Sequence, residues 1–408
     1  MRRTDTGERS RRLGTEATGA TEDAGAPVIP LAVPHLHGNE WRYLRECVDS
    51  GVVSSVGSFV DRFEREFATA VGTDHAVACS SGTAALHVAL RLAGAREGAL
   101  VATSTFSFIA SANAAHYTGA DLLLVDSESA TWNLDTERLH AEVVRRARVG
   151  GQLPDIVEAV HVLGHPTQME PLLALRDEFG ILVVEDAAEA LGARWSDGAL
   201  AGRQVGTAGV LGCFSFNGNK TITTGGGGMI VTDDGELARR AKHLTTQARL
   251  DGAGYVHDEV GYNYRLPNLG AAVGLAQLEQ LPALLDAKRA IARRYRESLA
   301  DAPVVPPPHA DWAEPSCWLY ALLLGPDTVD QSRLLRALAG RGVQTRPLWR
   351  PLHQQAPYAT TPRLGGAVAE RLADRGLALP SSAGLHPDQQ QHVIECLLAA
   401  LQSARGRP

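Results

Sequence analysis

Short apolar runs alternate with longer segments of helical spacing between residues 70 and 235. The short runs have the length of buried strands, and the segments between them repeat apolar residues every three or four positions, as helices do. The pattern predicts strands over 76–79, 99–103, 122–125, 156–162, 181–185, 210–216 and 229–232, and helices over 82–93, 107–117 and 169–179. Because strands that alternate with helices form parallel sheets, we expect an α/β fold with a mainly parallel central sheet.

The same pattern divides the chain into three parts. Residues 1–28 are rich in Arg, Thr, Glu and Gly and lack the apolar stretch of a signal peptide, so we expect a disordered tail. Segment 269–285 has helical spacing, and the proline-rich segment 303–308 is typical of a linker or an edge segment. We therefore expect a large domain over residues 29–284 and a smaller C-terminal domain over residues 285–408.

Composition narrows the classes of function. The 408 residues are 44% hydrophobic and 21% charged, and their formal net charge is −7. Without a basic surplus we expect no nucleic-acid partner, and no apolar run approaches the roughly 20 residues that span a membrane. The five cysteines are scattered and form no Cys-x-x-Cys pair, which is typical of a reduced protein, so we expect a cytoplasmic location.

Several predicted strands end on polar or glycine-containing clusters. Ligands of open α/β sheets bind at the carboxyl ends of the strands. The sequence therefore predicts a ligand site that is built from residues 80–83, residues 103–106, Asp186 and residues 217–220.

Lys220 is unusual because only three of the 39 basic residues are lysines. A guanidinium cannot lose its proton, whereas an amine can, and only the neutral amine attacks a carbonyl group. The segment around Lys220 is small and apolar and runs into four consecutive glycines, 225–228, which suits a desolvated amine. Taken alone, Lys220 is also compatible with an ordinary surface lysine.

Three other motifs accompany this lysine. Asp186 follows Glu185 at the end of a buried strand, where a charge is costly unless it meets a cation, although Asp is also a common helix N-cap. Gly82 and Thr83 begin a predicted helix, whose free N–H groups can bind a phosphate or serve an ordinary cap. Ser215, five residues before Lys220, can add a hydroxyl group to the same phosphate.

Together these motifs satisfy the requirements of pyridoxal phosphate: an imine-forming lysine, a carboxylate for the ring nitrogen and a phosphate cradle. Competing motifs fail. Residues 218–221 lack the adjacent Gly-Lys of a P-loop, and no G-x-G-x-x-G follows a strand. His161 and His165 have no third ligand at a suitable spacing, so we expect no metal.

With these motifs the chain resembles the DegT/DnrJ/StrS family of sugar aminotransferases, from about residue 29 to the C-terminus. The matching segments are 80–86, 184–192, 214–220, 261–266 and 342–353. The resemblance implies the fold-type I architecture of pyridoxal phosphate enzymes, in which a large domain with a mainly parallel mixed sheet is followed by a smaller C-terminal α+β domain. It also implies transamination, because family members that act as dehydratases carry His in place of the lysine.

The resemblance assigns roles around the cofactor ring. Lys220 would form the imine and then act as acid and base in the proton shift, and Asp186 would bind the pyridine nitrogen. Phe106 would stack on the ring, unless it is a core residue. Glu189 falls near the cofactor's 3-hydroxyl, where many relatives have Gln or His. The phosphate would be bound by Gly82, Thr83 and Ser215.

Two residues resemble those that reach the site from a second subunit, which implies a homodimer with shared active sites. Asn263 would contact the phosphate. Arg265 would bind the α-carboxylate of L-glutamate, the amino donor, through a bidentate pair, unless it forms a structural ion pair.

Within the family, segments 217–234, 243–247, 255–266 and 342–353 resemble the branch that aminates C4 of 4-keto-6-deoxy UDP-sugars in legionaminic acid and bacillosamine-type pathways. Arg346, Trp349 and His353 would then lie near the sugar nucleotide. The alternatives are a pyridoxal phosphate enzyme of secondary metabolism that acts on an aminocyclitol or another non-nucleotide keto substrate, or one with non-transamination chemistry. A regulator that borrowed the fold is disfavoured, because it needs a DNA-binding module.

Overall fold

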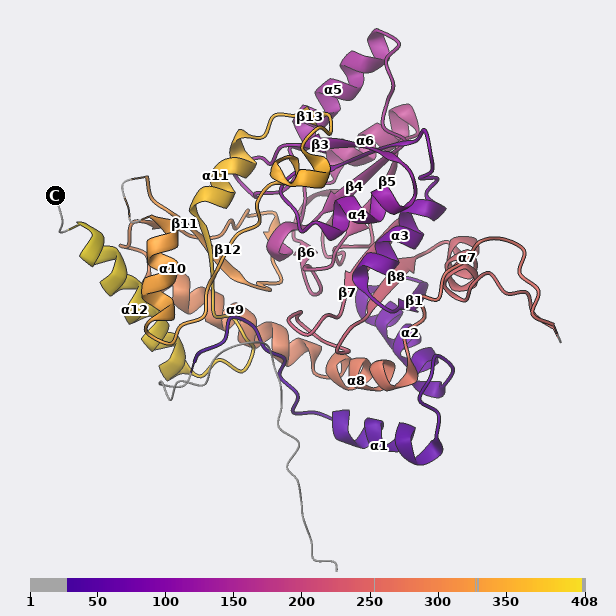
Figure 1. The fold of residues 1–408 in the computed structure, drawn as a ribbon, viewed down its shortest axis with the longest axis horizontal. Helices are drawn as coiled ribbons and strands as arrows, with labels where there is room; N and C mark the ends of the chain where they lie inside the picture. The colour runs from indigo at the N-terminus through magenta and orange to yellow at the C-terminus, as the bar shows by residue number, and fades with distance from the viewer. Residues whose placement is uncertain (1–27, 253, 327, 329, 406–408) are drawn as a thin grey trace, which may run out of the picture.

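An eight-stranded sheet forms the centre of the molecule (Figure 1). The structure, a computed structural model, describes residues 28–252, 254–326, 328 and 330–405; the expected tail lies outside these residues except for Val28. The strands lie in the order β1 (His75–Cys79), β8 (Gly228–Thr232), β7 (Leu211–Ser215), β5 (Leu182–Asp186), β4 (Ile156–Val160), β2 (Leu100–Ser104), β3 (Asp121–Val125) and β13 (Arg363–Leu364). Strand β8 is antiparallel to β1 and β7, and all other neighbours are parallel. The predicted mainly parallel sheet is confirmed.

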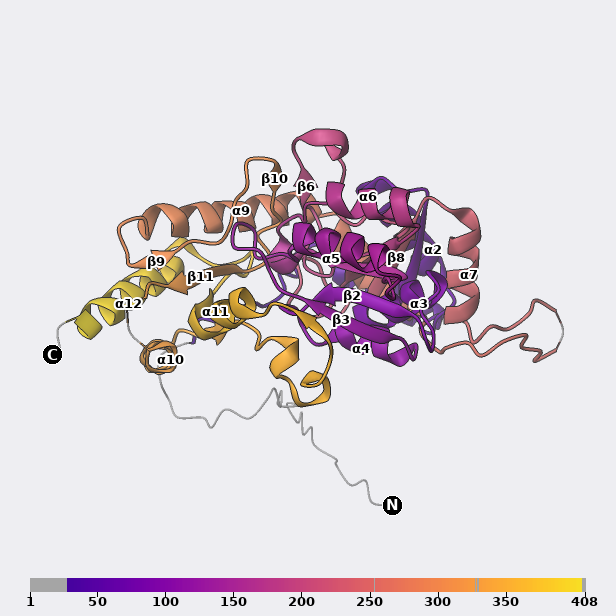
Figure 2. The same ribbon diagram turned by 90° about the horizontal axis from the view of Figure 1, so that it is seen from above.

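Apolar cores cover both faces of this sheet, because successive side chains of a strand point to opposite sides. Val183 of β5 belongs to one core and Val184 to the other. Seen from above, α6 lies on one side of the sheet and α4 on the other (Figure 2). The helices that precede the C-terminal part are α1 (Glu40–Ser50), α2 (Ser58–Val71), α3 (Gly82–Leu92), α4 (Ala110–Tyr117), α5 (Thr136–Arg148), α6 (Glu170–Phe179), α7 (Gly235–Thr245) and α8 (Asn268–Leu278).

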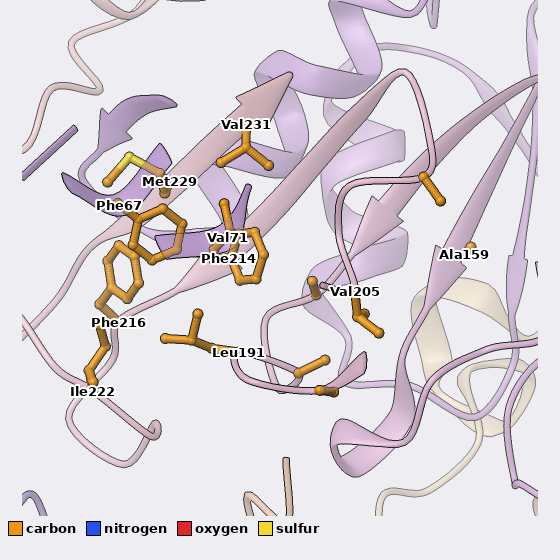
Figure 3. Close-up of a cluster of buried hydrophobic side chains, with 14 of the residues drawn as sticks. Phe67, Val71, Ala159, Leu191, Val205, Phe214, Phe216, Ile222, Met229 and Val231 are labelled. Atoms are coloured by element: carbon orange, nitrogen blue, oxygen red, sulfur yellow. The ribbon is translucent and has the colours of Figure 1, made fainter. Parts of the chain in front are cut away.

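Aromatic packing fixes the strand that leads to Lys220 (Figure 3). The ring of Phe67 in α2 lies 5.1 Å from that of Phe214 and 5.3 Å from that of Phe216, with both pairs in edge-to-face geometry. All three side chains are at most 1% exposed. The end of β7 is therefore fixed by packing against α2, directly before the chain enters the Lys220 loop.

The C-terminal part forms its own antiparallel sheet and core. Its strands lie in the order β12 (Arg346–Pro347), β14 (Gly376–Leu379), β11 (Tyr320–Leu324) and β9 (Val304–Val305), so the 303–308 segment supplies an edge strand. Strands β6 (Arg194–Trp195) and β10 (Ala313–Glu314) pair separately. The helices are α9 (Leu281–Ser298), α10 (Gln331–Ala339), α11 (Ala367–Arg375) and α12 (Pro387–Arg405). Among the described residues, none of the helices combines the length and apolarity that crossing a membrane requires.

The structure corrects one predicted helix. Segment 269–285 is split between α8, which ends at Leu278, and α9, which begins at Leu281. Pro282 lies in the first turn of α9, the position that proline favours, and it has no N–H to continue α8. The expected domain boundary at residues 284/285 falls inside α9, and β13 of the C-terminal part joins the large sheet beside β3. The division into domains stays a prediction.

Candidate active site

A pocket of about 280 Å³ opens at the carboxyl ends of β4, β5 and β7, where the sequence predicts a ligand site. Seven of the expected site residues line it: Gly82, Thr83, Asp186, Glu189, Ser215, Lys220 and Trp349. Other residues that line the pocket were not indicated by the sequence, among them Ser107, Phe108, Ser111 and Trp318. Phe106, Asn263, Arg265, Arg346 and His353 are not among its lining residues.

Lys220 lies in the loop between β7 and β8, and its side chain is 13% exposed. Its amine is 3.4 Å from Oε1 of Glu189 and 3.9 Å from the centre of the Trp318 ring. Lys220 is therefore not the solvated surface lysine that remained as an alternative. It is an amine with one long contact to a carboxylate and one aromatic face beside it.

Asp186 is the last residue of β5 and is 5% exposed. Its Oδ2 accepts a hydrogen bond of 2.8 Å from the Ser111 hydroxyl, which in turn lies 2.7 Å from the Ser107 hydroxyl. Burial raises the pKa of Asp186, and the Ser111 hydrogen bond and the Lys220 charge oppose that rise. No helix follows β5 directly, so Asp186 is not a helix cap. It is a buried carboxylate aimed at a pocket that can receive a cation.

Glu189 is the second carboxylate of the pocket. Its Oε2 accepts a hydrogen bond of 2.9 Å from the Leu163 N–H, so its orientation is set by the backbone after β4. Burial raises the pKa of Glu189, while the positive charge of Lys220 lowers it. One lysine thus faces two buried carboxylates.

The first turn of α3 enters the pocket beside Ser215. The Ser81 hydroxyl caps α3 by accepting from the Ala84 N–H at 3.0 Å, and the helix geometry leaves the N–H groups of Gly82 and Thr83 without intrahelical partners. A Cβ on Gly82 would lie 2.7 Å from the Cβ of Ser215, so only glycine allows this approach. The first turn of α3 therefore has both a side-chain cap and free N–H groups that can form a cradle for an anion.

Two expected contacts fall elsewhere. Phe106 is fully buried and packs against Trp349, with ring centres 5.5 Å apart, whereas Phe108 lines the pocket and is 56% exposed. His353 is 4% exposed, with Nδ1 2.7 Å from the Thr105 hydroxyl and Nε2 2.9 Å from Oε1 of Glu370. Phe106 is thus the core residue that was the alternative, and both ring nitrogens of His353 are engaged away from the pocket.

The residues expected to serve a second subunit lie outside the pocket of their own chain. Asn263 is exposed and forms a backbone bridge with Thr246. Arg265 is half-buried and forms a backbone bridge with Cys79, the last residue of β1. Arg346, which was expected near the sugar nucleotide, is also outside the pocket and is exposed on β12. The roles assigned to these residues stay predictions.

The two histidines considered as metal ligands are engaged in hydrogen bonds. His161 Nδ1 accepts from the Thr167 N–H at 3.0 Å, which places the ring proton on Nε2, 2.9 Å from Oε2 of Glu185. His165 Nε2 accepts from the Ala310 N–H at 3.2 Å. Both rings therefore brace loops beside the sheet.

Three of the pocket residues that the sequence did not indicate were missed for different reasons. Ser111 lies in α4 and reaches Asp186 across 75 sequence positions, and nothing in its local sequence marks it. Phe108 follows Phe106 by two residues in a segment without strand geometry, so alternation could not distinguish them. Trp318 comes from the C-terminal part, about 100 residues beyond Lys220, and carries no motif.

Comparisons with known proteins agree with this geometry. The profile of the DegT/DnrJ/EryC1/StrS aminotransferase family matches residues 34–398. The chain is 39% identical over 378 residues to EpsN of Bacillus subtilis, which is named as a pyridoxal phosphate-dependent aminotransferase, covering 91% of this chain and 95% of EpsN. It is 38% identical to the GDP-perosamine synthase of Caulobacter vibrioides, covering 91% and 98%.

Solved structures give the same assignment. S. venezuelae DesV, solved with a ketimine intermediate, superposes with a TM-score of 0.82 at 30% identity, covering 92% of this chain and 98% of DesV. The Streptoalloteichus hindustanus aminotransferase TlmJ superposes with a TM-score of 0.83 at 28% identity, covering 93% and 100%. The chain belongs to the DegT/DnrJ/EryC1/StrS aminotransferase family.

Proposed function

We propose that this chain is a pyridoxal phosphate-dependent aminotransferase that moves the amino group of L-glutamate onto a nucleotide-linked 4-keto-6-deoxy sugar. The carrying observation is that Lys220, Asp186 and the first turn of α3 line one pocket. The residues fit the cofactor: a buried carboxylate suits a protonated ring nitrogen, and the free N–H groups at the start of α3, beside Ser215, suit an anion. Phe108, which lines the pocket, would contact the ring face in place of Phe106.

The cofactor, when bound, supplies an aldehyde that carries the amino group and a ring that accepts electrons from the breaking Cα–H bond of the donor. Lys220 Nζ would hold the aldehyde carbon and later carry the proton removed from the donor's Cα. Asp186, fixed by Ser111, would keep the proton on the ring nitrogen. Glu189, which makes a long contact with Lys220, would lie beside the neighbouring ring hydroxyl, as the resemblance implies.

The acceptor is inferred from the curated relatives together with the narrower resemblance in the sequence. The Caulobacter relative is named for GDP-perosamine, a nucleotide-linked 4-amino sugar. The resemblance of segments 217–234 and 255–266 is to enzymes of UDP-linked sugars. We therefore propose amination at C4 of a nucleotide-linked sugar and leave GDP and UDP to the assay, with Trp349 and Arg346 on the acceptor side.

The donor and the assembly rest on Arg265 and Asn263. Both lie outside their own pocket, as residues that complete the site of a second copy would. We propose a homodimer in which Arg265 binds the α-carboxylate of L-glutamate.

The test begins with purified protein and added pyridoxal phosphate. We expect a visible absorbance band, and borohydride reduction should fix the cofactor to a peptide that contains Lys220. L-glutamate should then bleach the band and release 2-oxoglutarate, and a GDP- or UDP-linked 4-keto-6-deoxyhexose should restore it. A protein that stays colourless would overturn the cofactor assignment, and a band that glutamate leaves unchanged would favour non-transamination chemistry.

A further inference from the structure

Trp318 stands against Lys220 and has no role in the assignments above. It precedes β11 of the C-terminal part, is 5% exposed and lines the pocket. The face of its ring lies 3.9 Å from the amine of Lys220. An ammonium group at this distance is attracted by the ring quadrupole. The indole face has no strong hydrogen-bond acceptor, so the contact leaves the ammonium group free to lose its proton.

Hydrogen bonds to the ring and to the main chain of Trp318 fix the residue in this position. The indole Nε1 donates to the carbonyl oxygen of Asn219, the residue before Lys220, at 2.7 Å. The main-chain oxygen of Trp318 accepts from Nζ of Lys288 at 3.0 Å, and Lys288 also donates to the Ser381 oxygen at 3.0 Å. The tryptophan is thus tied both to the Lys220 loop and to α9.

The segment before Trp318 is locked onto the large sheet. The Ser316 hydroxyl donates to the Glu189 main-chain oxygen at 2.8 Å, and the Ser316 N–H donates to the Gly164 oxygen at 3.0 Å. Cys317 has φ 55°, a left-handed conformation that is costly for a residue other than glycine. The surrounding contacts hold this strained turn, and the turn directs the indole toward Lys220.

We propose that Trp318 is a positioning residue for Lys220, whose amine it holds in the pocket, aimed at the carbonyl carbon that the amine attacks. This inference rests on the proposed function of Lys220. Lysine side chains have many rotamers, so holding the amine in one place raises the fraction of encounters that form a bond. Glu189 alone, at 3.4 Å, does not provide this restraint, because a carboxylate contact of that length is weak.

The first test measures how fast cofactor-free protein reacts with pyridoxal phosphate, followed by visible absorbance in a stopped-flow instrument. Trp318→Leu should slow the reaction about 2- to 30-fold, the range that restoring the rotamer freedom of one lysine side chain gives, and Trp318→Phe should slow it less. Affinity for pyridoxine 5′-phosphate, which lacks the aldehyde and cannot bond to lysine, should stay within about twofold. An unchanged reaction rate in Trp318→Leu, or an equal loss of pyridoxine phosphate affinity, would overturn the proposal.

The second test observes the amine directly, without cofactor. Because the chain has only three lysines, NMR of protein labelled with ¹³C at the lysine ε carbon should show three signals, with Lys242 assigned by Lys242→Arg. The aromatic ring should displace the Lys220 signal upfield. Trp318→Leu should abolish this displacement, Trp318→Phe should retain most of it, and Trp349→Leu, the same change elsewhere in the pocket, should leave it intact.

The two tests separate the two ideas. Wild-type protein that fails to bind pyridoxine phosphate would refute the cofactor assignment. A Lys220 signal without ring displacement in wild-type protein would refute the role of Trp318 whatever the cofactor result.

Discussion

Glu158 and Glu185 of the central sheet are both fully buried, but only the carboxylate of Glu185 has hydrogen-bond partners among the described residues. Glu185 accepts from His161 and from the backbone N–H groups of residues 206, 208 and 209, and the His161 hydrogen bond holds the pKa of Glu185 below its usual range against the effect of burial. Among the described residues, neither carboxyl oxygen of Glu158 has a hydrogen-bond partner. Burial and the nearby Asp186 raise the pKa of Glu158 well above its usual range. Burial in β4 therefore favours the neutral form of the Glu158 carboxyl group.

This difference predicts opposite pH dependences of stability. As pH rises above about 4.3, the unfolded chain loses the Glu158 proton while the folded chain keeps it, so wild-type protein loses stability relative to Glu158→Gln. We expect the unfolding free energy of Glu158→Gln, measured with urea, to rise by about 1–3 kcal/mol relative to wild type between pH 5 and pH 8. Glu185→Gln is the matched control: it should cost about 2–4 kcal/mol at pH 8, and that cost should shrink as the pH falls below about 4. A constant gap for Glu158→Gln across this window would show that Glu158 is already ionised.

Lys220 carries the residue-scale prediction for activity. Lys220→Ala removes the only amine in the pocket among the described residues, so turnover should fall about a thousandfold or more. Thermal unfolding followed in parallel should still show one cooperative transition, so that the lost turnover is assigned to chemistry and not to misfolding. Normal turnover in Lys220→Ala would contradict the proposed function.

At the scale of elements, the approach of α3 to the end of β7 shapes the anion cradle. Gly82 begins α3, and Ser215 ends β7. The close fit means that the helix N-terminus and the strand end form one surface, which neither element presents alone.

Gly82→Ala should therefore disturb the cradle. The added Cβ would lie 2.7 Å from the Ser215 Cβ, and we expect a loss of about 1–3 kcal/mol in unfolding free energy and weaker binding of pyridoxine phosphate. The double variant Gly82→Ala/Ser215→Gly should recover the stability, because the clashing carbon is gone. Gly218→Ala, in the Lys220 loop with no atom within 4 Å of its added Cβ, is the control and should change neither quantity. Equal effects of Gly82→Ala and Gly218→Ala would rule out the steric explanation.

At the scale of the whole molecule, the pocket is assembled from distant parts of the chain. Trp318 and Trp349 enter from beyond α9, and β13 of the same C-terminal part pairs with β3. Arg265 and Asn263, by contrast, do not reach the pocket of their own chain. A dimer would explain how such residues could serve a pocket that they do not reach in their own chain.

Mixing two inactive variants tests that arrangement. Dimers that combine a Lys220→Ala subunit with an Arg265→Met subunit contain one intact site if each site uses Lys220 from one chain and Arg265 from the other. After subunit exchange of an equal mixture, half the dimers are hybrids, so activity should rise to about one quarter of wild type. Activity that stays at the level of the separate variants would place both residues in the site of one chain.

The sequence alone determined the parts of the fold and site that are local. Each predicted strand of the large sheet appears within a few residues of its expected bounds, because apolar runs between helical segments leave few other ways to bury their side chains. Asp186, Gly82 and Ser215 stood out because each lies at or just after the end of a strand, and the carboxyl ends of neighbouring strands meet at one edge. Lys220 stood out because it is one of only three lysines.

Only the tertiary structure decided which side chains complete the pocket. Phe108 lines the pocket and Phe106 does not, His353 contacts Thr105 and Glu370, and Trp318 faces Lys220. These outcomes depend on contacts between segments far apart in the chain, such as the indole hydrogen bond that spans 99 positions from Trp318 to Asn219. Periodicity reports whether a side chain is buried, but the neighbour that covers it is set by how the layers pack, and that information is not local.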